Sequence, residues 1–189
     1  VIEHHAVLHA VDSLATDGFT VTKISVDAEG FFKLDELKKA IQPDTFLVSL
    51  MYANNEIGTI EPIAEIGKII RKINSDRLTT ILFHTDACQA GGYLDVDVNK
   101  LHVDLLTLNG SKLYGPKQTG CLYVRKGVVL QPLIYGGGQE KNLRSGTENV
   151  AGAVGFATAL TLAQREQVKE TRRLETLRNY FISLVLRSV

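Results

Sequence analysis

The sequence lacks the features that would assign it to several classes of protein. It has only two cysteines, Cys88 and Cys121, which lie far apart and have no metal-ligand spacing. Its 21 basic and 21 acidic side chains leave no net charge, so no electrostatic excess favours a nucleic acid or an anionic membrane. No apolar run approaches the roughly 20 residues of a membrane-spanning helix, and none reads as a signal peptide. We therefore expect a soluble cytoplasmic protein in a reducing compartment, without nucleic-acid or membrane partners.

Strand-like and helix-like segments alternate along the 189 residues, which is typical of an α/β fold with a largely parallel sheet and helices on its faces. Apolar and β-branched runs predict strands at 19–26, 45–51, 79–86, 105–108, 121–125 and 129–134. Apolar residues at helical spacing predict helices at 6–15, 34–41 and 62–73, a buried helix at 149–163, and a charged amphipathic helix at 164–187.

A pair of side chains with complementary chemistry lies at the carboxyl ends of two predicted strands. Asp86 stands at the carboxyl end of one apolar run, and Lys112 stands where the next run breaks into a Gly and Pro loop. Open α/β sheets bind ligands at the carboxyl ends of their strands. An acid and a lysine placed there suit pyridoxal phosphate, because the lysine forms the Schiff base and the acid keeps the pyridine nitrogen protonated. The alternative is a surface salt bridge or two unrelated loop charges.

The residues around this pair resemble the cysteine desulfurases of iron-sulfur cluster assembly, within the class V aminotransferases. The resemblance covers nearly the whole chain, in the family's order. Its runs are Glu3-His4, Asn54-Asn55-Glu56-Ile57-Gly58, His84-Thr85-Asp86-Ala87-Cys88-Gln89, Gly110-Ser111-Lys112-Leu113-Tyr114-Gly115-Pro116-Lys117, Gly136-Gly137-Gly138-Gln139-Glu140 and Arg144-Ser145-Gly146-Thr147. It implies the three-layer α/β/α large domain of the fold-type I pyridoxal phosphate-dependent transferases.

The resemblance also implies a role for each matching residue in the cofactor site. Lys112 matches the Schiff-base lysine, and His4 matches the histidine that stacks on the cofactor ring and moves protons. Asp86 and Gln89 match the residues that bond the pyridine nitrogen and the phenolic oxygen. Asn55 matches the asparagine near that oxygen and the substrate carboxylate. An ordinary helix-start histidine and a turn asparagine are the alternatives for His4 and Asn55.

The phosphate-binding residues depart from the family pattern. Asn109 and Ser111 stand where better-known desulfurases have serine and histidine, so amide and hydroxyl donors remain but the charge of a histidine is lost. Thr147 matches a residue that reaches the phosphate of a neighbouring subunit's cofactor, which implies a homodimer. His5 and His9 have the i, i+4 spacing of zinc ligands, but no third ligand is indicated, and we expect no metal.

The reaction implied by the resemblance converts L-cysteine to L-alanine and passes the sulfur to an enzyme cysteine as a persulfide, for delivery to a sulfur-acceptor scaffold protein. Compared with the family, the chain starts inside the large domain and stops before the small domain. We expect residues 1–163 to be a partial cofactor-binding domain and residues 164–189 a helix leading to the small domain. The persulfide cysteine and the arginine for the substrate carboxylate are expected outside the chain, which predicts an inactive fragment.

Two other functions compete with this one. Another class V enzyme, such as a selenocysteine lyase or an aminotransferase, shares the lysine and the aspartate. Asn55 with its neighbours and the run from Arg144 to Thr147 favour the desulfurase. A non-catalytic scaffold with the same fold is the third possibility, and the presence of both Lys112 and Asp86 speaks against it.

Overall fold

The computed structural model describes residues 1–188, which form two compact units. The first unit comprises residues 1–89, 96–108 and 121–130, and the second comprises residues 90–95, 109–120 and 131–188. Among these described residues, no helix combines the length and the apolar character needed to cross a membrane.

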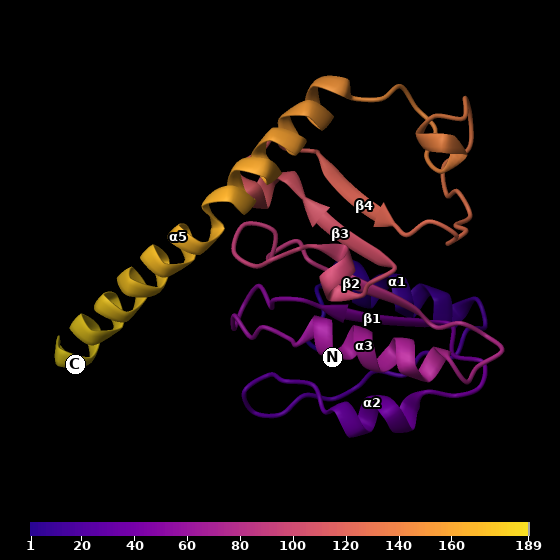
Figure 1. Ribbon diagram of the computed structural model, residues 1–189, viewed down its shortest axis with the longest axis horizontal. Coiled ribbons are helices and arrows are strands. Elements are labelled where there is room, and N and C mark those ends of the chain that lie inside the picture. The colour runs from indigo at the N-terminus through magenta and orange to yellow at the C-terminus, as the bar shows by residue number, and fades with distance from the viewer. Residues whose placement is uncertain (189) are drawn as a thin grey trace. The chain divides into compact units, whose positions relative to one another are not determined.

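A four-stranded sheet has the order β1-β2-β3-β4 (Figure 1). The first three strands are parallel: Met51 at the end of β1 lies opposite Asp86 at the end of β2, and Asp86 lies opposite Thr107 of β3. β4 runs antiparallel beside β3, because Asp104, just before β3, accepts a backbone hydrogen bond from Arg125, just after β4 (2.8 Å). The strands are β1 (Leu47–Met51), β2 (Leu82–Asp86), β3 (Leu105–Asn109) and β4 (Gly120–Val124).

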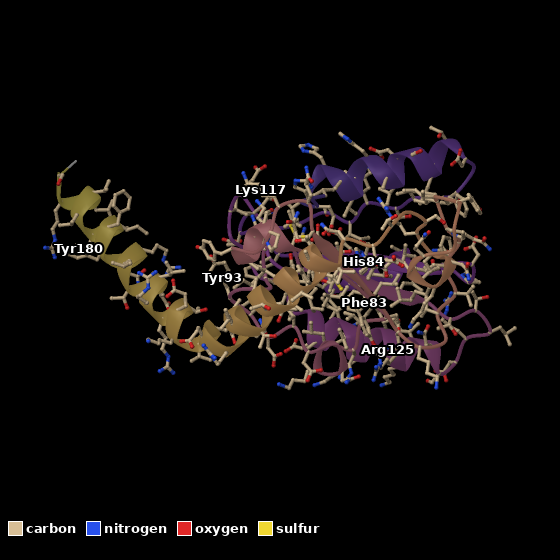
Figure 2. All side chains as sticks on the ribbon, turned by 90° about the horizontal axis from the view of Figure 1, so that it is seen from above. Phe83, His84, Tyr93, Lys117, Arg125 and Tyr180 are labelled. Atoms are coloured by element: carbon tan, nitrogen blue, oxygen red, sulfur yellow. The ribbon has the colours of Figure 1, made fainter. Side chains whose placement is uncertain are left out.

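Helices of the first unit cover both faces of the sheet. α1 (His5–Thr16) lies on one side and α3 (Ile63–Asn74) on the other (Figures 1 and 2). The unit also contains the short helices α2 (Leu34–Ala40) and α4 (Val98–Leu101). The core is apolar, and its most deeply buried side chains include Ile63, Ile66, Ile70, Ile81 and Phe83. The predicted α/β/α layering, the mostly parallel sheet and the three helices of this region are confirmed.

The second unit is organised around a single long helix, α5 (Val150–Ser188). Phe156 is buried on its first half. Further along, the Gln164 amide donates to the carbonyl oxygens of Gly91 and Leu94 (2.8 and 2.9 Å), and the Gln167 amide donates to Tyr93 (2.7 Å). Two 3₁₀ helices, η1 (Gly110–Leu113) and η2 (Glu140–Asn142), complete the regular structure of this unit.

Three sequence-based predictions of local structure are wrong. Residues 19–26 and 129–134 form no strand and contribute only the isolated bridges of Val26 with Phe32 and of Ile134 with Arg144. β-branched composition favours an extended backbone, but a strand also needs a neighbour to hydrogen-bond with. The helix predicted as buried at 149–163 continues without a break into the next, and only Gly152 and Phe156 are buried along α5.

Candidate cofactor site

Asp86 is a buried carboxylate fixed at the carboxyl end of β2. Its side chain is only 8% exposed, and Oδ1 accepts a hydrogen bond from the backbone N–H of Cys88 at 2.9 Å. The backbone on either side is tied to both neighbouring strands, through Tyr52 N–H to the Asp86 carbonyl (2.9 Å) and Ala87 N–H to the Thr107 carbonyl (3.0 Å). The chain can therefore hold a carboxylate in one orientation at the ligand-binding edge of the sheet.

His84 precedes Asp86 by two residues and lies on the same face of β2. Its ring bridges the adjacent strands, with Nδ1 2.8 Å from Ser49 Oγ on β1 and Nε2 2.9 Å from Thr107 Oγ1 on β3. Burial lowers the pKa of His84, while the Asp86 charge acts in the opposite direction. His84 was not among the predicted site residues, although its two-residue spacing from Asp86 on a strand predicts that the two side chains share a face.

His4 caps the start of α1. Its Nδ1 accepts the N–H of Ala6 at 3.1 Å, and its side chain is exposed. The preceding residue, Glu3, instead points inward, and its Oε1 accepts the backbone N–H of Met51 at the end of β1. His4 therefore has the helix-start role, and its Nε2 is left for other contacts. Glu3 adds a half-buried acid beside it, which local sequence patterns do not predict.

The two asparagines after β1 have different environments. Asn54 forms a turn: its Oδ1 accepts the N–H groups of Glu56 and Ile57 (2.8 and 3.0 Å), and its Nδ2 donates to the Ile2 carbonyl (2.8 Å). Asn55 is exposed beside it. Asn54 is thus the turn residue, and Asn55 is the one whose side chain is available to a ligand.

Lys112 lies in η1, in the second unit, three residues after β3 ends. Asn109 caps this 3₁₀ helix, because its Oδ1 accepts the Ser111 N–H (2.9 Å) and the Ser111 hydroxyl (2.7 Å). A side chain on Gly110 would collide with Thr119, so the turn requires glycine. The candidate phosphate residues Asn109 and Ser111 are hydrogen-bonded to each other, and a phosphate would have to compete with that bond for the Ser111 hydroxyl.

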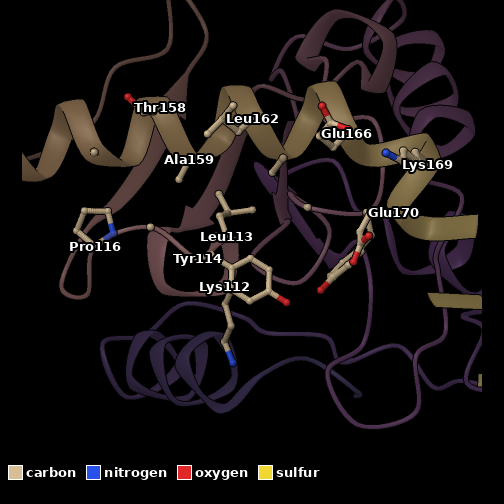
Figure 3. Close-up of a pocket in the computed structure, with 15 residues that line it drawn as sticks. Lys112, Leu113, Tyr114, Pro116, Thr158, Ala159, Leu162, Glu166, Lys169 and Glu170 are labelled. Carbon is tan, nitrogen blue, oxygen red and sulfur yellow. The ribbon is translucent and has the colours of Figure 1, made fainter. Parts of the chain in front are cut away.

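A cavity of about 620 Å³ lies in the second unit between η1 and α5. Lys112, Leu113 and Tyr114 line it from η1 and the residue that follows, while Leu162 and Glu166 line it from α5. Leu113 points toward α5, whereas the Lys112 side chain extends away from that helix (Figure 3). The exposed amine of Lys112 is therefore accessible to an aldehyde.

The predicted cofactor residues are divided between the two units. His4, Asn55, Asp86 and Gln89 belong to the first, and Asn109, Ser111, Lys112 and Thr147 belong to the second. Gln89 is half-buried after β2, and Thr147 is exposed in the loop before α5. His5 and His9 stack on α1 with ring centroids 5.2 Å apart, and residues 1–188 contain no group of three His, Cys, Asp or Glu side chains that could hold a metal ion.

Comparison with known proteins identifies relatives across nearly the whole chain. The family model described as aminotransferase class-V matches residues 1–187. A cysteine desulfurase IscS of Dictyoglomus turgidum is 52% identical over 181 residues, which are 96% of this chain and 44% of that protein. A cysteine desulfurase IscS of Methanosarcina thermophila is 50% identical over 186 residues, with 98% and 45% covered.

Solved structures agree with these sequence matches. A NifS-like protein superposes with a TM-score of 0.93 at 44% identity and covers 98% of this chain and 50% of that one. A structure of SspA in complex with cysteine gives a TM-score of 0.78 at 42% identity, with 85% and 45% covered. The chain thus spans about half the length of the relatives it matches.

Proposed function

Because the chain belongs to the class-V aminotransferase family, we propose that it is the large-domain part of a pyridoxal phosphate-dependent cysteine desulfurase. The observation that carries this proposal is the match, along 96–98% of the chain, to proteins named cysteine desulfurase. A related structure in complex with cysteine supports L-cysteine as the substrate. The family is pyridoxal phosphate-dependent, which agrees with the cofactor predicted from the sequence.

The side chains of this chain fit the chemical needs of pyridoxal phosphate. The buried Asp86 carboxylate, already oriented by the Cys88 N–H, can hold a proton on the ring nitrogen. With its ring protonated, the bound cofactor serves as an electron sink for bonds at the substrate α-carbon. The exposed Lys112 supplies the amine for covalent attachment.

The same proposal gives each of the other predicted residues a role in binding the cofactor or moving protons. Gln89 would bond the phenolic oxygen, and Asn55 would lie near that oxygen and the substrate carboxylate. Asn109 and Ser111 would bind the phosphate with neutral amide and hydroxyl donors. His4 stacks on the ring and moves protons through Nε2, because Nδ1 is occupied by the Ala6 N–H.

Some parts of the proposal concern the longer protein. Thr147 serves the phosphate site of a second copy, so the working protein is a homodimer. Residues 1–163 form the cofactor-binding part, and α5 leads from residue 164 toward a small domain. That domain supplies the thiolate that takes sulfur from L-cysteine as a persulfide, leaving L-alanine, before transfer to a sulfur-acceptor scaffold protein in the cytoplasm. Without it, we expect this chain alone to form no alanine from cysteine.

The first test is the visible absorption spectrum of the purified chain with added pyridoxal phosphate, before and after borohydride reduction. We expect a visible band that reduction removes while fixing the cofactor to Lys112, as peptide mass spectrometry would show. Lys112→Ala removes the amine, and Lys117→Ala, five residues later in the same loop, is the matched control that keeps it. A band that survives Lys112→Ala, or attachment at Lys117, would refute the assignment of Lys112.

A chain extended to the full length of its relatives decides between the cofactor proposal and a non-catalytic scaffold. If the short chain shows no band but the extended one does, the missing segments complete the site. If neither shows a band, the pyridoxal phosphate assignment is wrong.

A further inference from the structure

Glu3 is a half-buried acid of the first unit whose carboxylate group is only partly hydrogen-bonded. Oε1 accepts the backbone N–H of Met51, but Oε2 is buried and has no hydrogen-bond partner among residues 1–188. Met51 is the last residue of β1 and lies opposite Asp86 in the sheet. An unpaired buried carboxylate oxygen is costly, so its retention beside the candidate site calls for a functional explanation.

The segment that contains Glu3 is attached to the end of β1 at two points. Met51 N–H binds the Glu3 carboxylate, and Asn54 Nδ2 binds the carbonyl of Ile2 at 2.8 Å. His4 follows directly and begins α1. Because both bonds are made by the two residues directly before His4, they fix where α1 begins and therefore where the His4 ring is held.

The charges around Glu3 favour its protonated form. Burial raises the pKa of Glu3 to about 6, opposed by the hydrogen bond from Met51. The negative charges of Asp86 and Glu61 raise this pKa further, and the amino group of Val1 lowers it. The Asp86 charge therefore acts together with burial to make ionisation of Glu3 less favourable.

We propose that Glu3 is a positioning residue of the cofactor site, which anchors the His4 segment to β1 through the Met51 N–H. In its protonated form Glu3 adds no second negative charge near Asp86, the residue proposed to hold the proton on the ring nitrogen. The link to the cofactor rests on the proposed function, whereas the anchoring and the protonation of Glu3 are properties of this chain alone.

The protonation of Glu3 and its dependence on the Asp86 charge are tested without cofactor, by NMR titration of the chain carrying ¹³C-labelled glutamate. We expect the Glu3 carboxyl carbon to titrate near pH 6 and to move to lower pH in Asp86→Asn, because a neighbouring negative charge is lost. Glu61→Gln is the matched control and should produce a smaller shift, since the Asp86 charge acts more strongly on Glu3. Titration at the ordinary glutamate value, or an equal or larger shift from Glu61→Gln, would overturn the Glu3–Asp86 pairing.

The anchoring is tested by comparing Glu3→Gln with Glu3→Ala. Glutamine keeps an oxygen for the Met51 N–H, so its amide exchange should stay as slow as in the wild type, whereas Glu3→Ala should speed it about tenfold, as expected for the loss of one hydrogen bond. Glu56→Ala, an exposed acid in the nearby turn, should change nothing. Equal Met51 exchange in Glu3→Ala and wild type would refute the anchor, and so would fast exchange in Glu3→Gln.

The same variants separate this inference from the proposed function. Pyridoxal phosphate affinity should be kept in Glu3→Gln and lowered in Glu3→Ala. If even the wild-type chain and its extended form bind no pyridoxal phosphate, the proposed function fails, while the titration and exchange results still decide the role of Glu3. If affinity is unchanged in Glu3→Ala although Met51 exchange is faster, the link between Glu3 and the cofactor site is wrong.

Discussion

The β2 strand and the second half of α5 carry similar apolar side chains in opposite environments. Phe83 on β2 is fully buried, whereas Phe181 on α5 is 66% exposed. β2 has a strand on each side, and its unit has helices over both faces of the sheet. The second half of α5 has no such cover among the described residues, and its side chains from Leu177 to Leu186 include seven exposed large apolar groups: Leu177, Tyr180, Phe181, Ile182, Leu184, Val185 and Leu186.

This contrast teaches that apolar spacing predicts which face of an element needs covering, but not what covers it. The stripe predicted on residues 164–187 forms a helix as expected, because 3.6-residue periodicity is a local property. Whether this stripe is buried depends instead on the other segments or chains that pack against the helix. An exposed apolar face of this kind is normally an interaction surface, which agrees with the proposal that α5 leads into a further domain.

The largest effect in this comparison is expected from Phe83→Ala. The substitution opens a cavity in a fully buried position and should reduce the free energy of unfolding by about 3 to 5 kcal/mol. Urea denaturation followed by circular dichroism measures this loss. Phe31→Ala removes the same ring from a side chain in the same unit that is 43% exposed, and its effect should be clearly smaller. Equal losses would show that burial does not distinguish the two positions.

Glu3, a half-buried acid of the same unit, should make the stability of the chain depend on pH. The pKa of Glu3 lies at about 6 in the folded chain, above its ordinary value of 4.5, so the folded state holds the proton more tightly than the unfolded one. The stabilisation that comes from this tighter proton binding is therefore complete below pH 4.5 and is lost as pH rises through 6. The loss amounts to about 2 kcal/mol for a pKa shift of this size.

The measurement compares wild type with Glu3→Gln in urea at several pH values. Glutamine cannot ionise, so the variant should lack this loss and gain about 2 kcal/mol relative to wild type between pH 4 and 7. Glu56→Gln is the control for the general effect of removing one negative charge, because Glu56 is an exposed acid in the turn after β1. Parallel pH profiles for wild type and Glu3→Gln would contradict the raised pKa.

Much of the first unit could be predicted from the sequence because its signals are local. β1, β2 and α3 follow from apolar runs and helical spacing, and the positions of Asp86 and Lys112 follow from where such runs end. The strand predicted at residues 19–26 is wrong, because a strand needs a neighbouring strand to hydrogen-bond with. The alternation of apolar and polar residues shows only which side chains could be buried.

The missed residues of the candidate site needed three-dimensional contacts. Glu3 looks like an ordinary acid at a helix start, and its burial depends on Met51, 48 residues later. His84 depends on hydroxyls from two other strands, Ser49 and Thr107. Strand periodicity places His84 on the Asp86 face, but the hydroxyl partners require the register of β1 and β3, which the sequence does not specify.

The smallest effect on stability is expected from Phe181→Gln on α5. The ring is mostly exposed and glutamine is at least as good a helix former, so the free energy of unfolding should change by no more than about 0.5 kcal/mol. Phe156→Gln is the matched control on the same helix, and it should destabilise strongly because Phe156 is buried. Light scattering at rising protein concentration should also show less association for Phe181→Gln than for wild type, since the apolar stripe is shortened. A loss above 1 kcal/mol for Phe181→Gln would mean that this stripe is covered in solution, and the contrast between β2 and α5 would then fail.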